Sequence, residues 1–544
     1  MGYLLAYTRK PEAEHYHAAL AHSVHFAFSA DGKLYEPFHL NCGILFAQGA
    51  VNADNTIAAK ALTRPGIVRR KNGAYLIQAQ QTDENGRDEP LYPRWETRDF
   101  IAFRYLGAAS APAAVPGDQP EAAGIEGFAS GGRLEVPDAL ALAAYTYWTP
   151  LRNIAVRVPQ RITAKTADDV RAMSAEAVYS DGSTCEKRVD WDLSGVDFSR
   201  SGEYGVSGTA RQLEPEFPIF RAHGDPVFFP WRGMWHYINT NDWNGDRQFI
   251  VRRAATVEGL LAENAERGLI LDVSETFVQT FWAPEFHEIG GALYLLFAVS
   301  GAQWGPQCHV MKLKQGGDIL RAEDWGPPVR VCRRDGSPLA GEGAITLDMT
   351  HLRAGNRSYA VWSYREHIGT KLDSGSMLYI AEIDPENPAR LQSGPVLLSR
   401  PLYGWENIDG TINNEGPHAF VHCGRVYLAY SGGSANKYSY AVGLLTADEN
   451  ADLLNLANWT KRPAPALSYV SVPGRLGPGH NSFFSYGGEL YIAYHAEYND
   501  TDSPRCAALH RVHFDANGEP RFDLGPERDL NPALREVTTL VRIA

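Results

Sequence analysis

The stretch APEFHEIGGALYLLF, residues 283–297, decides the fold prediction. Two short apolar runs flank its glycine pair, which is the pattern of two β-strands joined by a tight turn. The second half recurs along the chain as glycine, then an alternating run containing Tyr or Trp, and then small or polar residues. The copies are GMWHYINTND from Gly233, GALYLLFAVS from Gly291, GNRSYAVWSY from Gly355, GRVYLAYSGG from Gly424 and GELYIAYHAE from Gly488.

These repeats predict an all-β fold. The five units, 58 to 69 residues apart, fall within residues 213–544 and indicate a five-bladed β-propeller with about four strands in each blade. The step exceeds the roughly 40–50 residues of an ordinary blade. Long loops should therefore project from the blades, and such loops commonly build active sites.

The chain before residue 213 is predicted to form two smaller β parts. Residues 1–106 read as an accessory β segment, because RPGIVRRKNGAYLIQAQQ (64–81) is similar to the first propeller hairpin, RAHGDPVFFPWRGMWHYINT (221–240). That copy lacks the carboxylate of the later segment. We expect the segment to pack on the propeller, or else to pair directly with one of its strands. Residues 107–124, GAASAPAAVPGDQPEAAG, are rich in Ala, Pro and Gly and are predicted to be a linker.

Residues 125–212 contain one predicted amphipathic helix, VPDALALAAYTYW (136–148), followed by strands around an Asp-Gly turn. Three elements carry a resemblance here: YSDG at 179–182, VDW at 189–191 and GEYGVSG at 202–208. They resemble the bacterial immunoglobulin-like modules of carbohydrate-active enzymes. The resemblance implies a spacer or packing module without chemistry of its own.

Composition and charge narrow the class of protein. The 544 residues are 44% hydrophobic and carry a net charge of −13. The acidic balance argues against a nucleic-acid partner, which would call for basic patches. No run of 18 apolar residues is present, so no membrane partner is expected. The first residues, MGYLLAYTRKPEAEHY, hold too short an apolar run for a signal peptide. We therefore expect a cytoplasmic protein, secreted only if a leader was removed.

Three acidic residues stand in distinctive settings. Asp225 lies in HGDPVFF, Asp348 in ITLDMT and Glu415 in NNEGPHAF. Each precedes the glycine-turn hairpin of its own repeat, so each should occupy a similar point on an innermost strand. Innermost strands line the axis of a propeller, and the three carboxyl groups should therefore point into one cavity.

These motifs resemble glycoside hydrolase family 43, whose members carry an Asp before Pro, an Asp in an IDGT-like strand and a Glu in EGP. The motifs WAPEFH (282–287) and GPGHNSF (477–483) also match, and the resemblance covers residues 213–544. The run from WENIDGTINNEGP onward is most similar to the exo-acting arabinofuranosidase branch. Met349 departs from that branch, which usually has Gly after the middle Asp.

The resemblance implies a role for each acid. Inversion needs a base that activates water and an acid that protonates the leaving oxygen, with the two carboxyl groups ~6.5–9.5 Å apart. Asp225 would be the general base, Glu415 the general acid, and Asp348 the residue that orients Glu415 and raises its pKa. For any one of these acids alone, a capping or turn role would be the simpler interpretation.

Five further residues are candidates for the site. The resemblance implies that His480 contacts a bound metal or a water in the central channel, and it implies a Ca²⁺ or other cation there but no organic cofactor. A buried histidine bonded to backbone is the alternative, because a lone histidine is not a complete metal site. Arg505 would bind substrate or the catalytic acid. Trp243, Phe281 and Trp282 are candidates for stacking on a sugar, with core packing as the alternative for each.

The sequence thus predicts an inverting glycoside hydrolase that releases terminal α-L-arabinofuranosyl residues from arabinan or arabinoxylan oligosaccharides. A β-xylosidase, another exo-glycosidase on the same fold, or a non-catalytic carbohydrate-binding propeller are the alternatives. The three intact acids argue against a binding protein, since a lectin needs no acid/base pair. Invertase-like propellers carry RDP and EC motifs, whereas this chain has LDM at 347–349 and EGP at 415–417.

Overall fold

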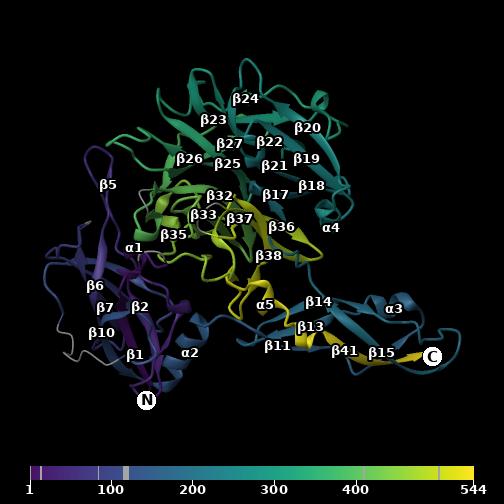
Figure 1. Cartoon of the computed structure of the whole chain (residues 1–544), viewed down its shortest axis with the longest axis horizontal. Coiled ribbons are helices and arrows are strands. Elements are labelled where there is room, and N and C mark those ends of the chain that lie inside the picture. Colours follow the sequence, from purple (N-terminus) through teal and green to yellow (C-terminus); the bar gives the residue numbers. More distant parts are fainter. Residues whose placement is uncertain are drawn as a thin grey trace. The chain divides into compact units, whose positions relative to one another are not determined.

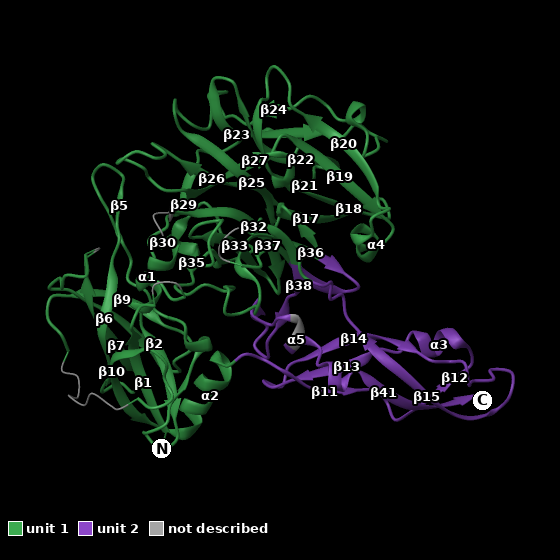
Figure 2. Cartoon of the chain, in the orientation of Figure 1, with its two compact units in different colours: residues 1–149, 217–484, 493–508 green, residues 150–216, 485–492, 509–544 purple. Residues whose placement is uncertain are grey.

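The computed structural model describes residues 2–12, 15–83, 85–113, 122–408, 411–499 and 503–543. Strands make up most of these residues and the helices are short, as Figure 1 shows, so the protein predicted to be all-β is mostly β. The chain divides into two compact units (Figure 2). The first comprises residues 1–149, 217–484 and 493–508, and the second comprises residues 150–216, 485–492 and 509–544.

Four antiparallel sheets follow one another between residues 223 and 461, each with its strands paired in sequence order. The repeat glycines Gly233, Gly291, Gly355 and Gly424 all have positive φ and join the first strand of a sheet to the second, as the sequence predicted. The first sheet consists of β17 (His223–Trp231), β18 (Met234–Asn241), β19 (Gln248–Ala254) and β20 (Glu266–Asp272), and the second of β21 (Gln279–Ile289), β22 (Ala292–Gly301), β23 (Trp304–Lys312) and β24 (Val329–Arg330). The third consists of β25 (Ile345–Ala354), β26 (Arg357–Arg365), β27 (Met377–Asp384) and β28 (Asn387–Leu391), with β29 (Val396–Ser399) beside β27, and the fourth of β32 (Asn414–His422), β33 (Arg425–Gly432), β34 (Ala441–Asp448) and β35 (Thr460–Lys461).

A fifth sheet joins the two ends of this series. Its strand order is β16 (Phe220–Arg221), β38 (Cys506–Arg511), β37 (Glu489–Glu497) and β36 (Leu476–Tyr486). Parts of β36, β37 and β38 are counted with the second unit. Phe220 pairs with Ala507 and Arg221 with Cys506, so a strand that precedes the first sheet is hydrogen-bonded into the last one. This pairing closes the series of sheets.

Consecutive sheets share hydrophobic cores. Leu295 and Phe297 of β22 pack with residues of the first sheet, whereas Tyr294 and Leu296 of the same strand pack with residues of the third. Side chains alternate between the two faces of a strand, so a strand buried on both faces must be apolar at every position. This explains the unbroken run ALYLLFAVSG of β22.

The first unit also contains an N-terminal part with two further sheets. Their strand orders are β10–β1–β2–β3 and β6–β7–β8–β9. The bounds are β1 Gly2–Arg9, β2 His25–Ser29, β3 Glu36–Pro37, β6 Ala61–Arg69, β7 Tyr75–Thr82, β8 Tyr92–Thr97, β9 Arg104–Ala109 and β10 Phe128–Val136. Helix α2 (Asp138–Trp148), which the sequence predicted, buries Ala141, Ala144 and Trp148 in the core of these sheets.

This arrangement differs from the predicted boundaries at residues 106 and 125. Strand β10 pairs with β1 over its whole length, and α2 belongs to the same core, so residues 128–148 lie with the N-terminal sheets. Most of the predicted linker, residues 114–121, lies outside the described residues. Strands β1 and β10 lie more than a hundred residues apart in the sequence but pair in one sheet, which local patterns do not reveal.

The N-terminal part packs against the third and fourth sheets within the first unit. Tyr16 and Phe46 belong to the same hydrophobic core as Leu378 and Leu428. The short hairpin β4 (Ala50–Val51) and β5 (Ile57–Ala58) projects from this part. Beside it, Arg400 donates to the side chain and backbone of Asn55 at 2.6 and 2.7 Å. A single β-bridge between residues 48 and 403 adds a backbone contact, so packing and limited strand pairing both occur.

The second unit is built on one six-stranded sheet of order β11–β13–β14–β15–β41–β12. The bounds are β11 Asn153–Arg157, β12 Arg161–Ala164, β13 Ala175–Tyr179, β14 Thr184–Trp191, β15 Gly202–Arg211 and β41 Glu536–Ile543. The last strand of the chain, β41, lies in this sheet between β15 and β12, whereas the sequence analysis extended the propeller to residue 544. Its strictly alternating burial suits a sheet that is covered on one face.

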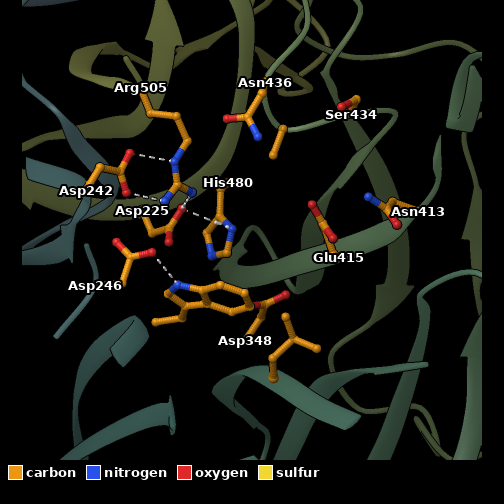
Figure 3. Close-up of a pocket in the computed structure, with 13 residues that line it drawn as sticks. Asp225, Asp242, Asp246, Asp348, Asn413, Glu415, Ser434, Asn436, His480 and Arg505 are labelled. Carbon is orange, nitrogen blue, oxygen red and sulfur yellow. Dashed lines mark hydrogen bonds and ion pairs between the residues drawn. The ribbon is translucent and has the colours of Figure 1, made fainter. Parts of the chain in front are cut away.

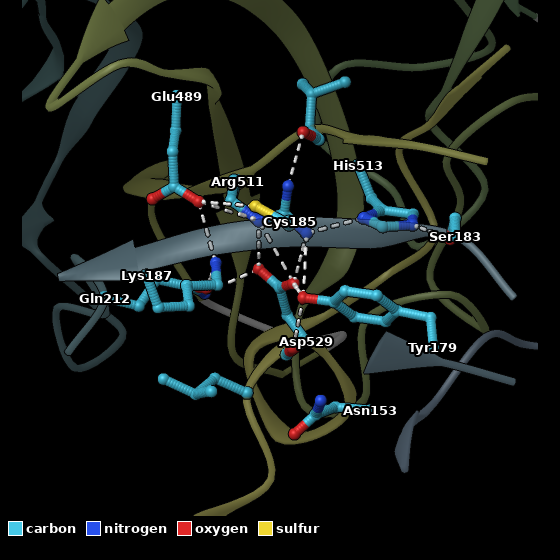
Figure 4. Close-up of polar contacts among 12 residues, drawn as sticks. Asn153, Tyr179, Ser183, Cys185, Lys187, Gln212, Glu489, Arg511, His513 and Asp529 are labelled. Atoms are coloured by element: carbon cyan, nitrogen blue, oxygen red, sulfur yellow. Dashed lines mark hydrogen bonds and ion pairs between the residues drawn. The ribbon is translucent and has the colours of Figure 1, made fainter. Parts of the chain in front are cut away.

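Buried ion pairs connect several segments within the second unit (Figure 4). Arg511 bonds Asp529 at 2.6 and 2.9 Å, and Tyr179 donates to the same carboxylate at 2.9 Å. Lys187 donates to Glu489 at 2.8 Å. The Arg511 charge holds the pKa of Asp529 below its usual value, although burial opposes this. Each charge is thus compensated by another, as buried ionic groups require.

Candidate active site

Backbone kinks position the acidic residues. Asp225 and Asp348 both have a φ of 53°, in the left-handed region, and each lies at an interruption of the strand register. Gly416, next to Glu415, has a φ of 56° and lies at a third interruption, between residues 415 and 418. These are β-bulges, which re-aim a side chain from the pleat of its strand. Pro226 and Pro417 fit here because a bulge leaves a backbone position outside the hydrogen-bond ladder.

The same kink occurs in the N-terminal part without an acid. Arg64 has a φ of 46° and precedes Pro65 at a register shift between residues 63 and 66 of β6. The similarity between residues 64–81 and 221–240 is therefore structural as well. Arg64 pairs with Asp88, and both side chains are half exposed. The copy keeps the backbone device but carries no carboxylate at the kink.

One cavity of about 460 Å³ collects the three predicted acids. Figure 3 shows Arg505, Asp242 and Asp225 on one side, Glu415 on the other and His480 between them. The residues that line it are Asp225, Asp242, Asp246, Trp282, Leu347, Asp348, Asn413, Glu415, Ser434, Ala435, Asn436, His480 and Arg505. All of them belong to the first unit.

Asp225 lies among positive and hydrogen-bonding groups. Its Oδ1 is 3.0 Å from Arg505 Nη1, 3.2 Å from His495 Nδ1 and 3.3 Å from His480 Nδ1. Thr240 donates to the other oxygen. Burial opposes ionisation, but Arg505 and His480 outweigh it and hold the pKa of Asp225 well below its usual value. This carboxyl group is therefore ionised across the physiological range.

The surroundings of Glu415 favour its protonated form, whereas those of Asp225 favour the ionised form. Burial, followed by the charge of Asp348, raises the pKa of Glu415 to about 7. Tyr440 donates a hydrogen bond to its Oε1 at 2.9 Å, which works against the rise. Asp348 accepts from Ser363 at 2.8 Å and from the Gly416 amide at 3.1 Å, and burial raises its pKa as well. The pocket thus places an ionised carboxylate, Asp225, together with a carboxyl group, Glu415, that keeps its proton to near neutral pH.

The three aromatic candidates have three different environments. Trp282 lines the cavity, and its Nε1 donates to Asp246 at 2.9 Å. Phe281 is 0% exposed and packs against Phe249 in the hydrophobic core, so the structure does not bring it to the pocket. Trp243 is 55% exposed and does not line the cavity. Successive side chains of a strand face opposite sides, which explains why Phe281 and Trp282 separate.

His480 and Arg505 both reach the pocket. The His480 amide donates to Ser431 at 2.7 Å, and the acids of the pocket, Asp225 first among them, raise the pKa of His480 against the effect of burial. Arg505 bridges Asp225 and Asp242, to whose Oδ2 it donates at 2.8 Å. The cation expected beside His480 stays a prediction.

Several lining residues were missed by the sequence analysis. Asp242 and Asp246 belong to the loop NDWNGD that follows β18, and Asn413 comes directly before β32. The sequence contained a signal for Asp242 and Asp246, because both acidic residues lie in the one short loop that follows the first hairpin. Asn413 had no comparable signal. The distinguishing feature of all three is their position at the same end of their sheets as the bulges.

Comparisons with known proteins show which family the chain resembles. Residues 222–520 match the family described as "Glycosyl hydrolases family 43". An "Extracellular exo-alpha-(1->5)-L-arabinofuranosidase" of Streptomyces avermitilis is 29% identical over 56% of this chain and 63% of its own length. A protein of the same name from Streptomyces chartreusis is 29% identical over 54% of this chain and 85% of its own. The crystal structure of an α-L-arabinofuranosidase from Lactobacillus brevis matches 56% of this chain and 95% of its own, with 27% identity and a TM-score of 0.49.

The comparisons also correct one expectation. A cytoplasmic protein was expected, but the two Streptomyces relatives are named extracellular enzymes, which overturns that expectation. Separately, none of the helices in the described ranges has the length and apolar character needed to cross a bilayer.

Proposed function

Because the chain belongs to family 43 of the glycosyl hydrolases, we propose that it is an inverting enzyme that releases terminal α-L-arabinofuranosyl residues from arabinan or arabinoxylan oligosaccharides. The names of the Streptomyces relatives support the sugar and the exo mode of action. We further propose that the five consecutive sheets are the five blades of a propeller, and that the six-stranded sheet of the second unit is an immunoglobulin-like module.

One observation carries the proposal: two carboxyl groups of one cavity have opposite protonation tendencies. Asp225 has a pKa held well below its usual value, and Glu415 has a pKa raised to about 7. Pairs of titratable groups whose surroundings push their pKa values apart identify the base and the acid of an enzyme. Asp225 is accordingly the base and Glu415 the acid, and Asp348 is the charge that helps to keep Glu415 protonated.

The chemistry follows from these states. Asp225 takes a proton from a water molecule, which attacks the anomeric carbon from the face opposite the leaving group. Glu415 gives its proton to the glycosidic oxygen as the bond to the anomeric carbon breaks. One water is consumed, no glycosyl-enzyme bond forms, and the released sugar has the inverted configuration. Arg505 holds Asp225 in place and fixes its charge, because it donates to Asp225 and Asp242 together.

The test is hydrolysis of p-nitrophenyl α-L-arabinofuranoside and of linear arabino-oligosaccharides, with proton NMR of the first product formed. We expect free arabinose and the β-anomer in the early spectra. Turnover of p-nitrophenyl β-D-xyloside alone would replace the proposed substrate by a xyloside. An initial α-anomeric product would reject inversion, and binding of the sugars without turnover would select the carbohydrate-binding alternative.

A further inference from the structure

Three metal-ligating side chains gather outside the lining of the proposed active site. Glu285 and His287 lie on β21 of the second sheet, and His418 lies on β32 of the fourth. One ligand atom from each of the three lies within 4.8 Å of the others. None of the three lines the cavity that contains Asp225 and Glu415. The proposed hydrolytic mechanism assigns this cluster no task.

The cluster is compact because of strand periodicity. Glu285 and His287 are two residues apart on one strand, so their side chains leave from the same face. The Glu285 Oε2 lies 2.6 Å from His287 Nε2 and 3.9 Å from His418 Nε2. The two imidazole rings lie roughly parallel, with centroids 5.9 Å apart. Thr350 of β25 completes the group, with its hydroxyl 3.4 Å from His287 Nε2.

One ring nitrogen of His418 has no hydrogen-bond partner. Its residue exposure is 9%, and its Nδ1 is buried without a hydrogen-bond partner. Its Nε2 faces the Glu285 carboxylate at 3.9 Å, which exceeds the reach of a hydrogen bond. The gap of 3.9 Å between His418 Nε2 and the Glu285 carboxylate leaves room for an ion that both groups could bind.

A cation fits this donor set. Two imidazole nitrogens and one carboxylate oxygen are the ligands of a first-row transition metal, whereas Ca²⁺ prefers six or more oxygens. Zinc bound at ~2.0–2.2 Å places its ligand atoms roughly 3.3–3.6 Å apart. The Glu285–His287 distance would widen and the Glu285–His418 distance would shorten, each by less than ~1 Å.

We propose that Glu285, His287 and His418 bind one divalent transition-metal ion, with zinc preferred and a water completing four-coordination. The ion ties β21 to β32, two strands of different sheets that share no hydrogen-bond ladder. His418 lies three residues after Glu415 on β32, and Thr350 lies two residues after Asp348 on β25. The site therefore braces the strands that present the acids, and it goes beyond the hydrolytic function proposed above.

The test uses the full chain, stripped with EDTA and desalted, then incubated with ZnCl₂ and desalted again. We expect one zinc per chain by mass spectrometry of the metal, a higher melting temperature, and no such rise with CaCl₂. Cobalt(II) in place of zinc should give the visible absorption of a four-coordinate site. A wild-type protein that retains no stoichiometric zinc or cobalt would overturn the proposal without any variant.

Variants locate the site. His418→Gln and Glu285→Gln should each weaken zinc binding at least tenfold and remove the zinc-dependent rise in melting temperature. His309→Gln is the matched control, since His309 is a buried histidine of β23 that bonds the Gln307 carbonyl oxygen at 2.8 Å and is not part of the cluster. It should keep one zinc. Equal zinc content in the folded His418→Gln and His309→Gln proteins would place the metal elsewhere and refute the assignment.

Discussion

Asp348→Asn tests whether a neighbouring charge tunes the proposed general acid. The pKa of Glu415 rises from the usual 4.5 to about 7, with burial as the larger cause and the charge of Asp348 as the next. That rise is worth on the order of 3 kcal/mol in favour of the protonated form. Asparagine removes the charge but keeps an oxygen that can accept from Ser363 and Gly416. The pKa of Glu415 should therefore fall, though by less than the full rise, because burial remains.

The activity should follow this pKa with a definite sign. A general acid works only while protonated, so kcat/KM is lost as the pH rises through the pKa of Glu415 in the free enzyme. In the wild type that alkaline limb should lie near pH 7. In Asp348→Asn it should move to lower pH. Tyr440→Phe should move it to higher pH, because the Tyr440 hydrogen bond lowers the pKa of Glu415.

The assay is kcat/KM against pH with an arabino-oligosaccharide, measured by chromatography of released arabinose. A sugar leaving group must be protonated as it departs, whereas p-nitrophenolate departs with little protonation. A p-nitrophenyl substrate would therefore not show the alkaline limb. Circular dichroism establishes that each variant is folded. The reasoning fails if both folded variants keep the wild-type limb, or if both move it in the same direction.

Three further outcomes are expected. Glu415→Gln should lower kcat on arabino-oligosaccharides by roughly 10²–10⁴-fold and on the p-nitrophenyl glycoside by much less; equal losses on both would count against an acid role. Arg505→Gln should move the acid limb of kcat/KM to higher pH, because Arg505 is the largest influence that lowers the pKa of Asp225; an unmoved acid limb would remove Asp225 as the base. Phe281→Ala should destabilise the fold by ~3–5 kcal/mol in urea unfolding, whereas exposed Trp243→Ala should change stability by only about 0.5 kcal/mol, and similar effects would contradict their different burial.

The sequence predicted the features that local pattern controls. The glycine-turn hairpins follow from Gly233, Gly291 and their copies, because a tight turn with positive φ leaves a visible signature between two apolar runs. The meeting of Asp225, Asp348 and Glu415 in one cavity followed from their equal positions before those hairpins. Repetition made a long-range contact predictable, since each repeat places the same position at the same end of its sheet.

Pairing across long sequence distances escaped the same reasoning. Strand β41 pairs with β15, more than three hundred residues earlier in the chain, and its alternating pattern is compatible with any half-covered sheet. Strand β10 joins β1 in the same way. Phe281 and Trp282 show a finer limit: two adjacent aromatic residues face opposite sides, and only the register of β21 decides which one reaches the pocket.

The bulges connect the architecture to the chemistry. Positive φ recurs in each of β17, β21, β25, β32 and β36, at Asp225, Ala283, Asp348, Gly416 and His480. For a residue with a side chain, this conformation costs roughly 1–2 kcal/mol. Ala283, in the second sheet, adopts this conformation although its side chain has no functional group. The kink is therefore part of the architecture and does not depend on a catalytic side chain. The chemistry then depends on which side chain occupies each kink or the residue beside it, and the N-terminal copy with Arg64 shows that the same backbone can exist without an acid.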